Sequence, residues 1–339
     1  MKVTINDVAK LAAVSIKTVS RVMNNESSVR EATRDKVQAA IEQLNYQPNL
    51  AARSLAGTKS YTIAFIYDNP NAYYVIDMQN GILSECKKQG YDLLIHPCNS
   101  KSCDIKEELT HMVKHSRVAG LVLTPPFSEM PDIVETLSNL NVQIIRIVSG
   151  KEQPDELSPC VMVNDKDAAL NVTQHLIDLG HEKIGFLNGG IEHMSSHERL
   201  NGFKEALNSN KINVEEKYIV QGEYSFESGV EGANKLLSGD DKPTAIFACN
   251  DEIAAGALFA ARLMNIKIPE QLSIIGFEDS PFSRQTWPKL STAHQPNKTI
   301  AQHAAALLIA ATRSQKAPEV VESFIPELVV RDSTAKVGH

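Results

Sequence analysis

Two short helical patterns with a tight break between them occupy residues 4–24, and they constrain the fold more than any other stretch of the chain. Thr4 and Asp7 form an approximate capping box, which predicts that the first helix begins at Thr4. Ser15 provides the cap of a second helix. A third amphipathic pattern over residues 31–44 supplies the apolar face that closes a small core. Three helices in this order predict an all-α helix-turn-helix domain whose second helix fits the major groove of DNA.

The charge of the chain is unevenly distributed. Residues 1–60 contain nine Lys or Arg and five Asp or Glu, a formal charge of +4, whereas the whole chain carries −7. The remaining residues therefore carry −11. Basic side chains neutralise DNA phosphates, while an acidic body repels nucleic acid. The asymmetry predicts a separate DNA-contacting head over residues 1–48.

A short segment follows this head. Asn49 is a good helix N-cap, and Gly57 stands where a helix would stop. A helix of about two turns is marginal in water on its own. We therefore expect residues 49–60 to be a hinge that orders against a DNA minor groove and the same segment of a second copy. Leu55 would be an apolar wedge between base steps, with Arg53 beside it. A plain linker with a buried leucine is the alternative.

These motifs resemble the head of the LacI/GalR family of bacterial repressors. The resemblance rests on Asp7-Val8-Ala9, Val14-Ser15, Thr18-Val19-Ser20-Arg21-Val22, Asn45-Tyr46-x-Pro48-Asn49 and Ala52-Arg53-Ser54-Leu55. It implies base readers at Ile16, Lys17 and Arg21, with Arg21 directed at guanine. The DNA-binding residues expected in all are Thr4, Ser15, Ile16, Lys17, Thr18, Ser20, Arg21, Asn24, Arg30, Tyr46, Asn49, Ala52, Arg53 and Leu55. Two positions depart from the family pattern: Ala13 replaces the usual turn glycine, and Arg30 replaces a cap serine.

Short apolar runs alternate with amphipathic helices through residues 61–339. One series of runs covers 62–67, 91–96, 118–123 and 142–148, and a second covers 183–187, 218–221, 244–248 and 272–276. Alternation of this kind predicts parallel sheets with right-handed crossovers. The fold class is therefore α/β, with two doubly wound lobes behind the helical head. The resemblance extends here too, since the family's body is similar to periplasmic sugar-binding proteins. The lobes expected are about 61–160 with 292–322, and 161–291 with 323–331.

A cleft between the carboxyl ends of the strands of both lobes is the expected ligand site. Position along the chain places Asn71, Tyr73, Tyr74, Thr124, Arg146, His193 and Ser195 near it. Arg146 lies in an apolar strand, where a buried guanidinium requires an anionic or multiply accepting partner; an internal salt bridge is the alternative. The family resemblance adds effector contacts at Arg199, Tyr224, Asn250 and Glu278, the last of which is usually aspartate.

Other classes of protein fit less well. The sequence has no G-x-S-x-G, Walker, G-x-G-x-x-G or H-E-x-x-H motif, so we expect neither an enzyme nor a cofactor. His111 and His115 stand four residues apart on a helix, but no third ligand is evident, and we expect no metal site. The five cysteines form no CxxC pair, which favours reduced thiols. The absence of a long apolar run and of a signal peptide predicts a cytoplasmic protein without a membrane partner.

Together these features predict a homodimeric transcriptional regulator, most simply a repressor of a sugar-utilisation operon. Its expected partners are a pseudo-palindromic double-stranded operator, a second copy of the chain, and a small sugar or sugar phosphate in the cleft. No leucine heptads follow Ser333, which favours a dimer over a tetramer. A purine or nucleoside is the alternative effector, because aromatic side chains stack equally well on bases. A sugar-binding protein without DNA function is a further alternative, which the head disfavours.

Overall fold

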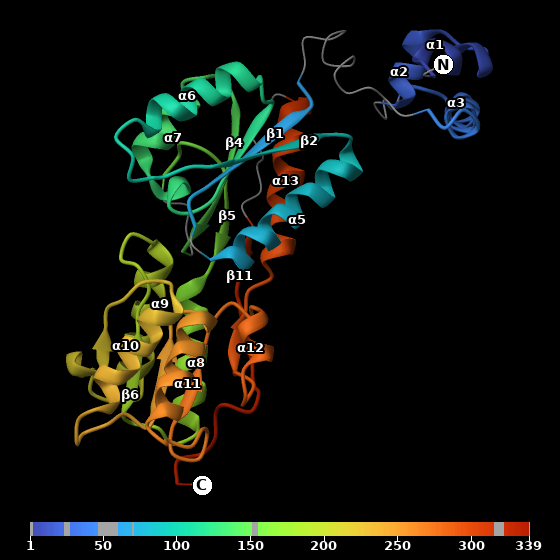
Figure 1. Cartoon of the computed structure of the whole chain (residues 1–339). Helices are drawn as coiled ribbons and strands as arrows, with labels where there is room; N and C mark the ends of the chain where they lie inside the picture. Colours follow the sequence, from blue (N-terminus) through green and yellow to red (C-terminus); the bar gives the residue numbers. More distant parts are fainter. Residues whose placement is uncertain are drawn as a thin grey trace. The chain divides into compact units, whose positions relative to one another are not determined.

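The computed structural model describes residues 3–23, 28–46, 60–69, 71–150, 155–314 and 322–338 (Figure 1). The chain divides into two compact units, with the boundary between Tyr61 and Thr62. The first unit contains the predicted head. The predicted hinge, residues 49–60, lies outside the described residues except for Ser60.

The head consists of α1 (Ile5–Leu11), α2 (Ile16–Met23) and α3 (Glu31–Gln43). The Asp7 carboxylate accepts hydrogen bonds from the Thr4 amide at 2.9 Å and the Thr4 hydroxyl at 2.7 Å, and α1 begins there as predicted. Ser15 Oγ accepts from the Thr18 amide at 3.1 Å and so caps α2. One valine from each helix is fully buried in the shared core: Val8, Val19 and Val37. The predicted three-helix head is confirmed.

The first lobe of the second unit is built on a parallel six-stranded sheet. Its strand order is β11 (Ser323–Phe324), β5 (Cys160–Val163), β4 (Gln143–Ser149), β3 (Gly120–Leu123), β1 (Thr62–Tyr67) and β2 (Asp92–Pro97). Helices α6 (Ile105–Ser116) and α7 (Pro131–Ser138) pack on one face, and the short helix η1 (Phe127–Glu129) connects β3 to α7. Helices α5 (Ala72–Gln89) and α13 (Asn297–Ser314) cover the other face (Figure 1).

The second lobe is built on a parallel four-stranded sheet. Its strand order is β7 (Ile219–Val220), β6 (Ile184–Leu187), β8 (Ala245–Ala248) and β9 (Ser273–Ile275). Its helices are α8 (Asp165–Asp178), α9 (Met194–Ser209), η2 (Glu216–Tyr218), α10 (Phe226–Leu237), α11 (Asp251–Leu263) and α12 (Pro281–Gln285). The core is rich in aromatic rings, with Phe186, Phe203, Phe247 and Phe277 all buried against one another. The two predicted doubly wound lobes are confirmed.

The lobe boundaries differ from the predicted ones by a few residues. The first sheet continues to Val163 and includes β11, although we assigned residues 161–163 and 323–324 to the second lobe. Conversely, β10 (Thr292–His294) pairs antiparallel with β12 (Glu327–Val329), and Ala293 is buried in the core of the second lobe. These strands are two to four residues long, too short to show a period of their own. None of the described helices is long and apolar enough to span a bilayer.

Candidate functional site

The second helix of the head presents the predicted outer face. Ile16, Lys17 and Arg21 are exposed, and Thr18 and Ser20 are half-buried. Ile16 is 49% exposed although it is apolar, beside two cationic side chains. An exposed aliphatic group can contact a thymine methyl, and a guanidinium matches the two acceptors of guanine. This face of α2 is suited to reading base edges in a major groove.

The remaining predicted DNA-contacting residues fall into three groups: exposed residues, one residue packed against the core of the head, and residues outside the described part of the chain. Thr4, Ser15 and Arg30 are exposed, and Arg30 stands at the N-cap of α3 without a side-chain capping bond. Tyr46 instead packs against the core of the head. Ala13, at the turn between α1 and α2, has a φ of 53°, the left-handed conformation for which glycine is common. Five predicted contacts lie outside the described residues: Asn24, Asn49, Ala52, Arg53 and Leu55.

A cavity lies between the two lobes of the second unit, at the carboxyl ends of their strands. Seven of the predicted effector residues line it: Asn71, Tyr74, His193, Ser195, Arg199, Tyr224 and Glu278. The other polar lining residues are Asn69, Ser149, Asp165 and Gln295, and the apolar ones are Pro125, Ile147, Val148 and Val163. The cavity therefore has an apolar wall from the first lobe and a dense set of hydrogen-bonding groups from both.

Arg199 is the centre of the polar network. It is 3% exposed. Its Nε donates to Asp165 Oδ1 at 2.8 Å, and its two terminal nitrogens donate to the Cys249 carbonyl at 2.7 Å and to Gln295 Oε1 at 3.3 Å. Its guanidinium carbon also lies 3.9 Å from the centre of the Phe277 ring. The guanidinium is thus held in one orientation by charge, hydrogen bonds and stacking.

Glu278 joins the network around Arg199 to Asn71 of the first lobe. Its Oε2 accepts from Asn71 Nδ2 at 2.6 Å, and its Oε1 lies 3.7 Å from Arg199 Nη1. Its φ is 95°, a strained conformation for a residue with a side chain, and its amide donates to the Ala293 carbonyl at 2.8 Å. A strained backbone conformation persists only where surrounding contacts hold it in place, and such residues are common at ligand sites.

Tyr224 forms an aromatic wall. Its hydroxyl lies 2.9 Å from Ser196 Oγ and 3.3 Å from Ser195 Oγ, and its ring meets His193 edge to face at a centroid distance of 5.4 Å. A Cβ at position 189 would lie only 2.4 Å from the Tyr224 ring, so Gly189 is needed for the ring to pack there. Burial raises the pKa of Tyr224, so its hydroxyl stays neutral and can donate and accept.

Several side chains join the two lobes across the cavity. Besides the Asn71–Glu278 bond, Ser149 Oγ donates to Asp165 Oδ2 at 2.6 Å. Glu129 of η1 accepts from the Ser149 amide at 3.1 Å and from the Met194 amide, at the start of α9, at 3.2 Å. Three of these bonds, Asn71–Glu278, Ser149–Asp165 and Glu129–Met194, run from the first lobe to the second and hold the two lobes in this arrangement.

Four predicted effector residues do not line the cavity. Arg146 corrects our prediction: its guanidinium pairs with Asp155 and donates to the Ser128 and Ser158 carbonyls, so it forms an internal salt bridge. Asn250 caps α11 by accepting from the Ile253 amide at 2.9 Å. Thr124 is fully buried. Tyr73 packs edge to face on Phe282 at a centroid distance of 5.7 Å and is not among the lining residues.

Glu278 also couples the stability of the fold to pH. Burial raises the pKa of Glu278 from 4.5 to about 7, so the folded chain keeps a proton that the unfolded chain releases in this window. The contribution of Glu278 to the free energy of unfolding therefore falls as pH rises from about 4.5 to about 7. We expect Glu278→Gln to reduce the difference in unfolding free energy between pH 5 and pH 8 by about 2–3 kcal/mol, since one pKa unit corresponds to ~1.4 kcal/mol.

Urea unfolding of both chains at the two pH values measures this difference. The contributions of Glu129 and Asp251 to the free energy of unfolding also fall as pH rises, because burial raises their pKa values to about 7 and about 8. These two contributions remain in the variant. Glu192→Gln is the matched control, since hydrogen bonding to the backbone lowers the pKa of Glu192. Equal pH dependence in wild type and Glu278→Gln would show that folding does not raise the pKa of Glu278.

Comparison with known proteins agrees with this architecture. Residues 4–49 match the family of bacterial regulatory proteins called the lacI family, and residues 173–334 match the periplasmic binding protein-like domain. The chain is 31% identical over 336 residues to the HTH-type transcriptional repressor PurR of Vibrio vulnificus (strain CMCP6), covering 99% of each chain.

Two solved structures share the fold along nearly the whole chain. The lac repressor dimer bound to operator and the anti-inducer ONPF is similar with a TM-score of 0.76 and 28% identity, covering 99% of this chain and 100% of that one. The complex of the transcriptional regulator CelR with cellobiose gives a TM-score of 0.74 and 25% identity, covering 98% and 99%. The chain belongs to the LacI family of bacterial regulatory proteins, which are DNA-binding transcriptional regulators and not enzymes.

Proposed function

We propose that this chain represses a sugar-utilisation operon as a cytoplasmic homodimer, and that an uncharged sugar in the cavity between the lobes controls it. The observation that supports this most is the lining of the cavity. Guanidinium, carboxylate, amide and hydroxyl groups converge there opposite an apolar wall. Sugars present the same combination, since their hydroxyls both donate and accept and their ring C–H faces pack on apolar surfaces.

The charges of the site favour a neutral sugar over the sugar phosphate that we also considered. Arg199 is the cationic side chain among the lining residues that the structure describes, and it already pairs with Asp165. Glu278 adds a second carboxyl group, which its raised pKa of about 7 leaves partly ionised at neutral pH. Arg146, for which we expected an anionic partner, forms its ion pair with Asp155. A phosphate dianion would therefore meet more negative than unpaired positive charge.

A purine or nucleoside is the second candidate, favoured by the relatives named PurR. Tyr74 and Tyr224 could stack on a base. Calorimetric titration of the full chain with neutral sugars, their phosphate esters, purines and nucleosides separates the two proposals. A neutral sugar should bind best, and Glu278→Gln should weaken it while Glu192→Gln does not. Tightest binding of a purine, or of a phosphate ester, would overturn the assignment.

The proposed mechanism links the cavity to DNA through the hinge. A ligand that binds one arrangement of the lobes more tightly shifts the population toward it, which changes the spacing of the two hinges in a dimer. Contacts such as Ser149–Asp165 and Glu129–Met194 are the ones that such a ligand would reinforce or break. The hinge then sets the affinity for a pseudo-palindromic operator.

Leu55, outside the described residues, is the proposed wedge in the minor groove. We expect Leu55→Ala to weaken operator binding by about 100-fold, because an inserted apolar side chain offsets a few kcal/mol of base unstacking. Ligand affinity should be unchanged, since the cavity belongs to the other unit. Fluorescence anisotropy with a labelled operator measures the first quantity and calorimetry the second. Wild-type operator affinity in the variant would refute the wedge.

A further inference from the structure

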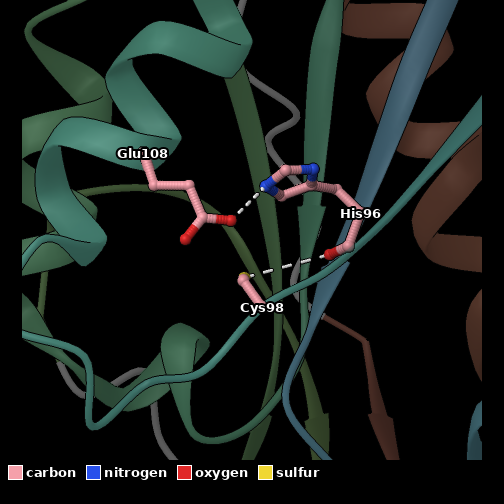
Figure 2. A group of neighbouring side chains, drawn as sticks. All are labelled: His96, Cys98 and Glu108. Atoms are coloured by element: carbon pink, nitrogen blue, oxygen red, sulfur yellow. Dashed lines mark hydrogen bonds and ion pairs between the residues drawn. The ribbon is translucent and has the colours of Figure 1, made fainter.

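A cluster of three metal-ligating side chains lies at the edge of the first lobe, outside the cavity (Figure 2). His96 comes from the end of β2, Cys98 follows that strand directly, and Glu108 comes from the first turns of α6. One ligand atom of each residue, the imidazole nitrogen, the thiol sulfur and a carboxylate oxygen, lies within 4.8 Å of the other two. Ligand atoms of one tetrahedral zinc ion lie about 3.3–3.7 Å apart, so these three side chains would need to shift by about an ångström or less to share a cation.

The pairing within the cluster is incomplete. His96 Nε2 lies 3.0 Å from Glu108 Oε1, yet it is buried and makes no aligned hydrogen bond to any described residue. The Cys98 thiol is 3.9 Å from the His96 carbonyl and 4.0 Å from the Tyr67 carbonyl, which are weak contacts for a donor. Buried polar groups normally have partners, so an unaligned ring nitrogen beside a thiol and a carboxylate indicates a site for another atom.

We propose that His96, Cys98 and Glu108 bind a divalent zinc ion, with a water molecule as the fourth ligand. Imidazole nitrogen, thiolate sulfur and carboxylate oxygen are the three ligand types that zinc accepts in proteins, and a set of three leaves one position open. The cation displaces the thiol proton of Cys98 as it binds. Glu108 is 43% exposed along its side chain, which provides a path from solvent.

The position of the cluster connects it to the cavity. The Cys98 amide donates to the Tyr67 carbonyl at 3.2 Å, and the amide and hydroxyl of Ser100 both donate to Asp68 Oδ2, at 2.8 and 2.7 Å. The loop after β2 is therefore hydrogen-bonded to the loop after β1. The cavity residues Asn69 and Asn71 follow β1 in the chain. A cation on His96, Cys98 and Glu108 fixes this pair of loops.

Titration of the full-length, reduced chain with Zn²⁺ against a chromophoric chelator tests the proposal. We expect one ion per chain, and Cys98→Ser, His96→Gln and Glu108→Gln should each weaken binding by at least about 100-fold, since even the loss of an outer partner costs about 10–100-fold. Cys103→Ser and His111→Gln are matched controls, because these residues lie on the same loop and helix outside the cluster. They should bind Zn²⁺ as the wild type does.

Cobalt substitution provides a readout that does not depend on affinity alone. Co²⁺ bound by the wild type should show the thiolate-to-metal charge-transfer absorption of a cysteine ligand. At saturating Co²⁺ this absorption should persist in His96→Gln and Glu108→Gln and disappear in Cys98→Ser. The use of three separate ligand variants keeps the test valid if one of them fails to fold. Absence of stoichiometric Zn²⁺ binding, or equal loss in Cys103→Ser, would overturn the proposal.

Discussion

We expect replacement of Arg199 with alanine to lower the free energy of unfolding by about 3–5 kcal/mol, the cost of leaving a buried charge without its partner. Asp165 is almost completely buried and loses the Nε donor at 2.8 Å. The Cys249 carbonyl and the Phe277 ring lose their contacts with the guanidinium as well. Under the proposed function, sugar binding is lost together with stability, because the same side chain organises the cavity.

Urea unfolding of wild type and variant measures the difference, and Arg262→Ala is the matched control. Arg262 is exposed near the end of α11, so its removal should change the free energy of unfolding by less than about 0.5 kcal/mol. A double variant that also carries Asp165→Asn should recover part of the loss, since it removes the unpaired carboxylate. If Arg199→Ala unfolds at the same urea concentration as Arg262→Ala, the buried pair contributes no net stability.

We expect replacement of Arg21 with alanine to weaken binding to the operator by about 1–3 kcal/mol, or roughly 5–150-fold. The physical reason is the loss of a bidentate contact with the two acceptors of a guanine edge, which the exposed position of Arg21 on α2 permits. Discrimination at one base pair of each half-site should relax at the same time. Binding to a panel of operators that differ at single base pairs shows both effects.

Lys36→Ala is the control for Arg21→Ala. Lys36 is exposed on α3, away from the reading helix, and its loss should weaken every operator of the panel alike and only slightly. The salt dependence of binding separates the two roles further. If Arg21→Ala instead weakens all operators equally, Arg21 contacts phosphate and another side chain reads the base.

The head was the part most open to prediction from sequence. Its caps are local: Asp7 is three residues from Thr4, and Ser15 is three residues from the amide of Thr18 that it caps. Its core follows from apolar spacing within single helices, as the burial of Val8 and Val19 shows. Interactions that lie within one turn of a helix leave a visible pattern in the sequence.

The cavity was predictable only where a strand could be recognised. Asn71 and Tyr74 follow a long apolar run, and both line the cavity as predicted. Asp165 was missed because the strand before it, β5, has only four residues and no clear period. Ser149 could have been found, since it ends the recognised strand 142–148 at its carboxyl end. Gln295 lies after the three-residue strand β10 and had no such signal.

Arg146 shows a different limit of sequence reasoning. Its burial was predicted correctly, but the choice between a ligand and an internal partner depends on where Asp155 lies, nine residues further along the chain. The cluster of His96, Cys98 and Glu108 was not predicted from the sequence for the same reason. Its spacing matches no metal-binding motif, and only the packing of α6 beside β2 brings Glu108 to His96.

Under the proposed function, occupancy of the cavity between the lobes alters the affinity of the head for specific DNA. Quantitative footprinting of the full chain on the genomic fragment it prefers, with and without the sugar that calorimetry identifies, tests this directly. We predict a protected palindromic site whose half-saturation concentration changes by about 5–150-fold with sugar, the usual range of allosteric coupling, and by much less in Glu278→Gln. An identical half-saturation concentration with and without a bound sugar would show that the cavity does not control DNA binding.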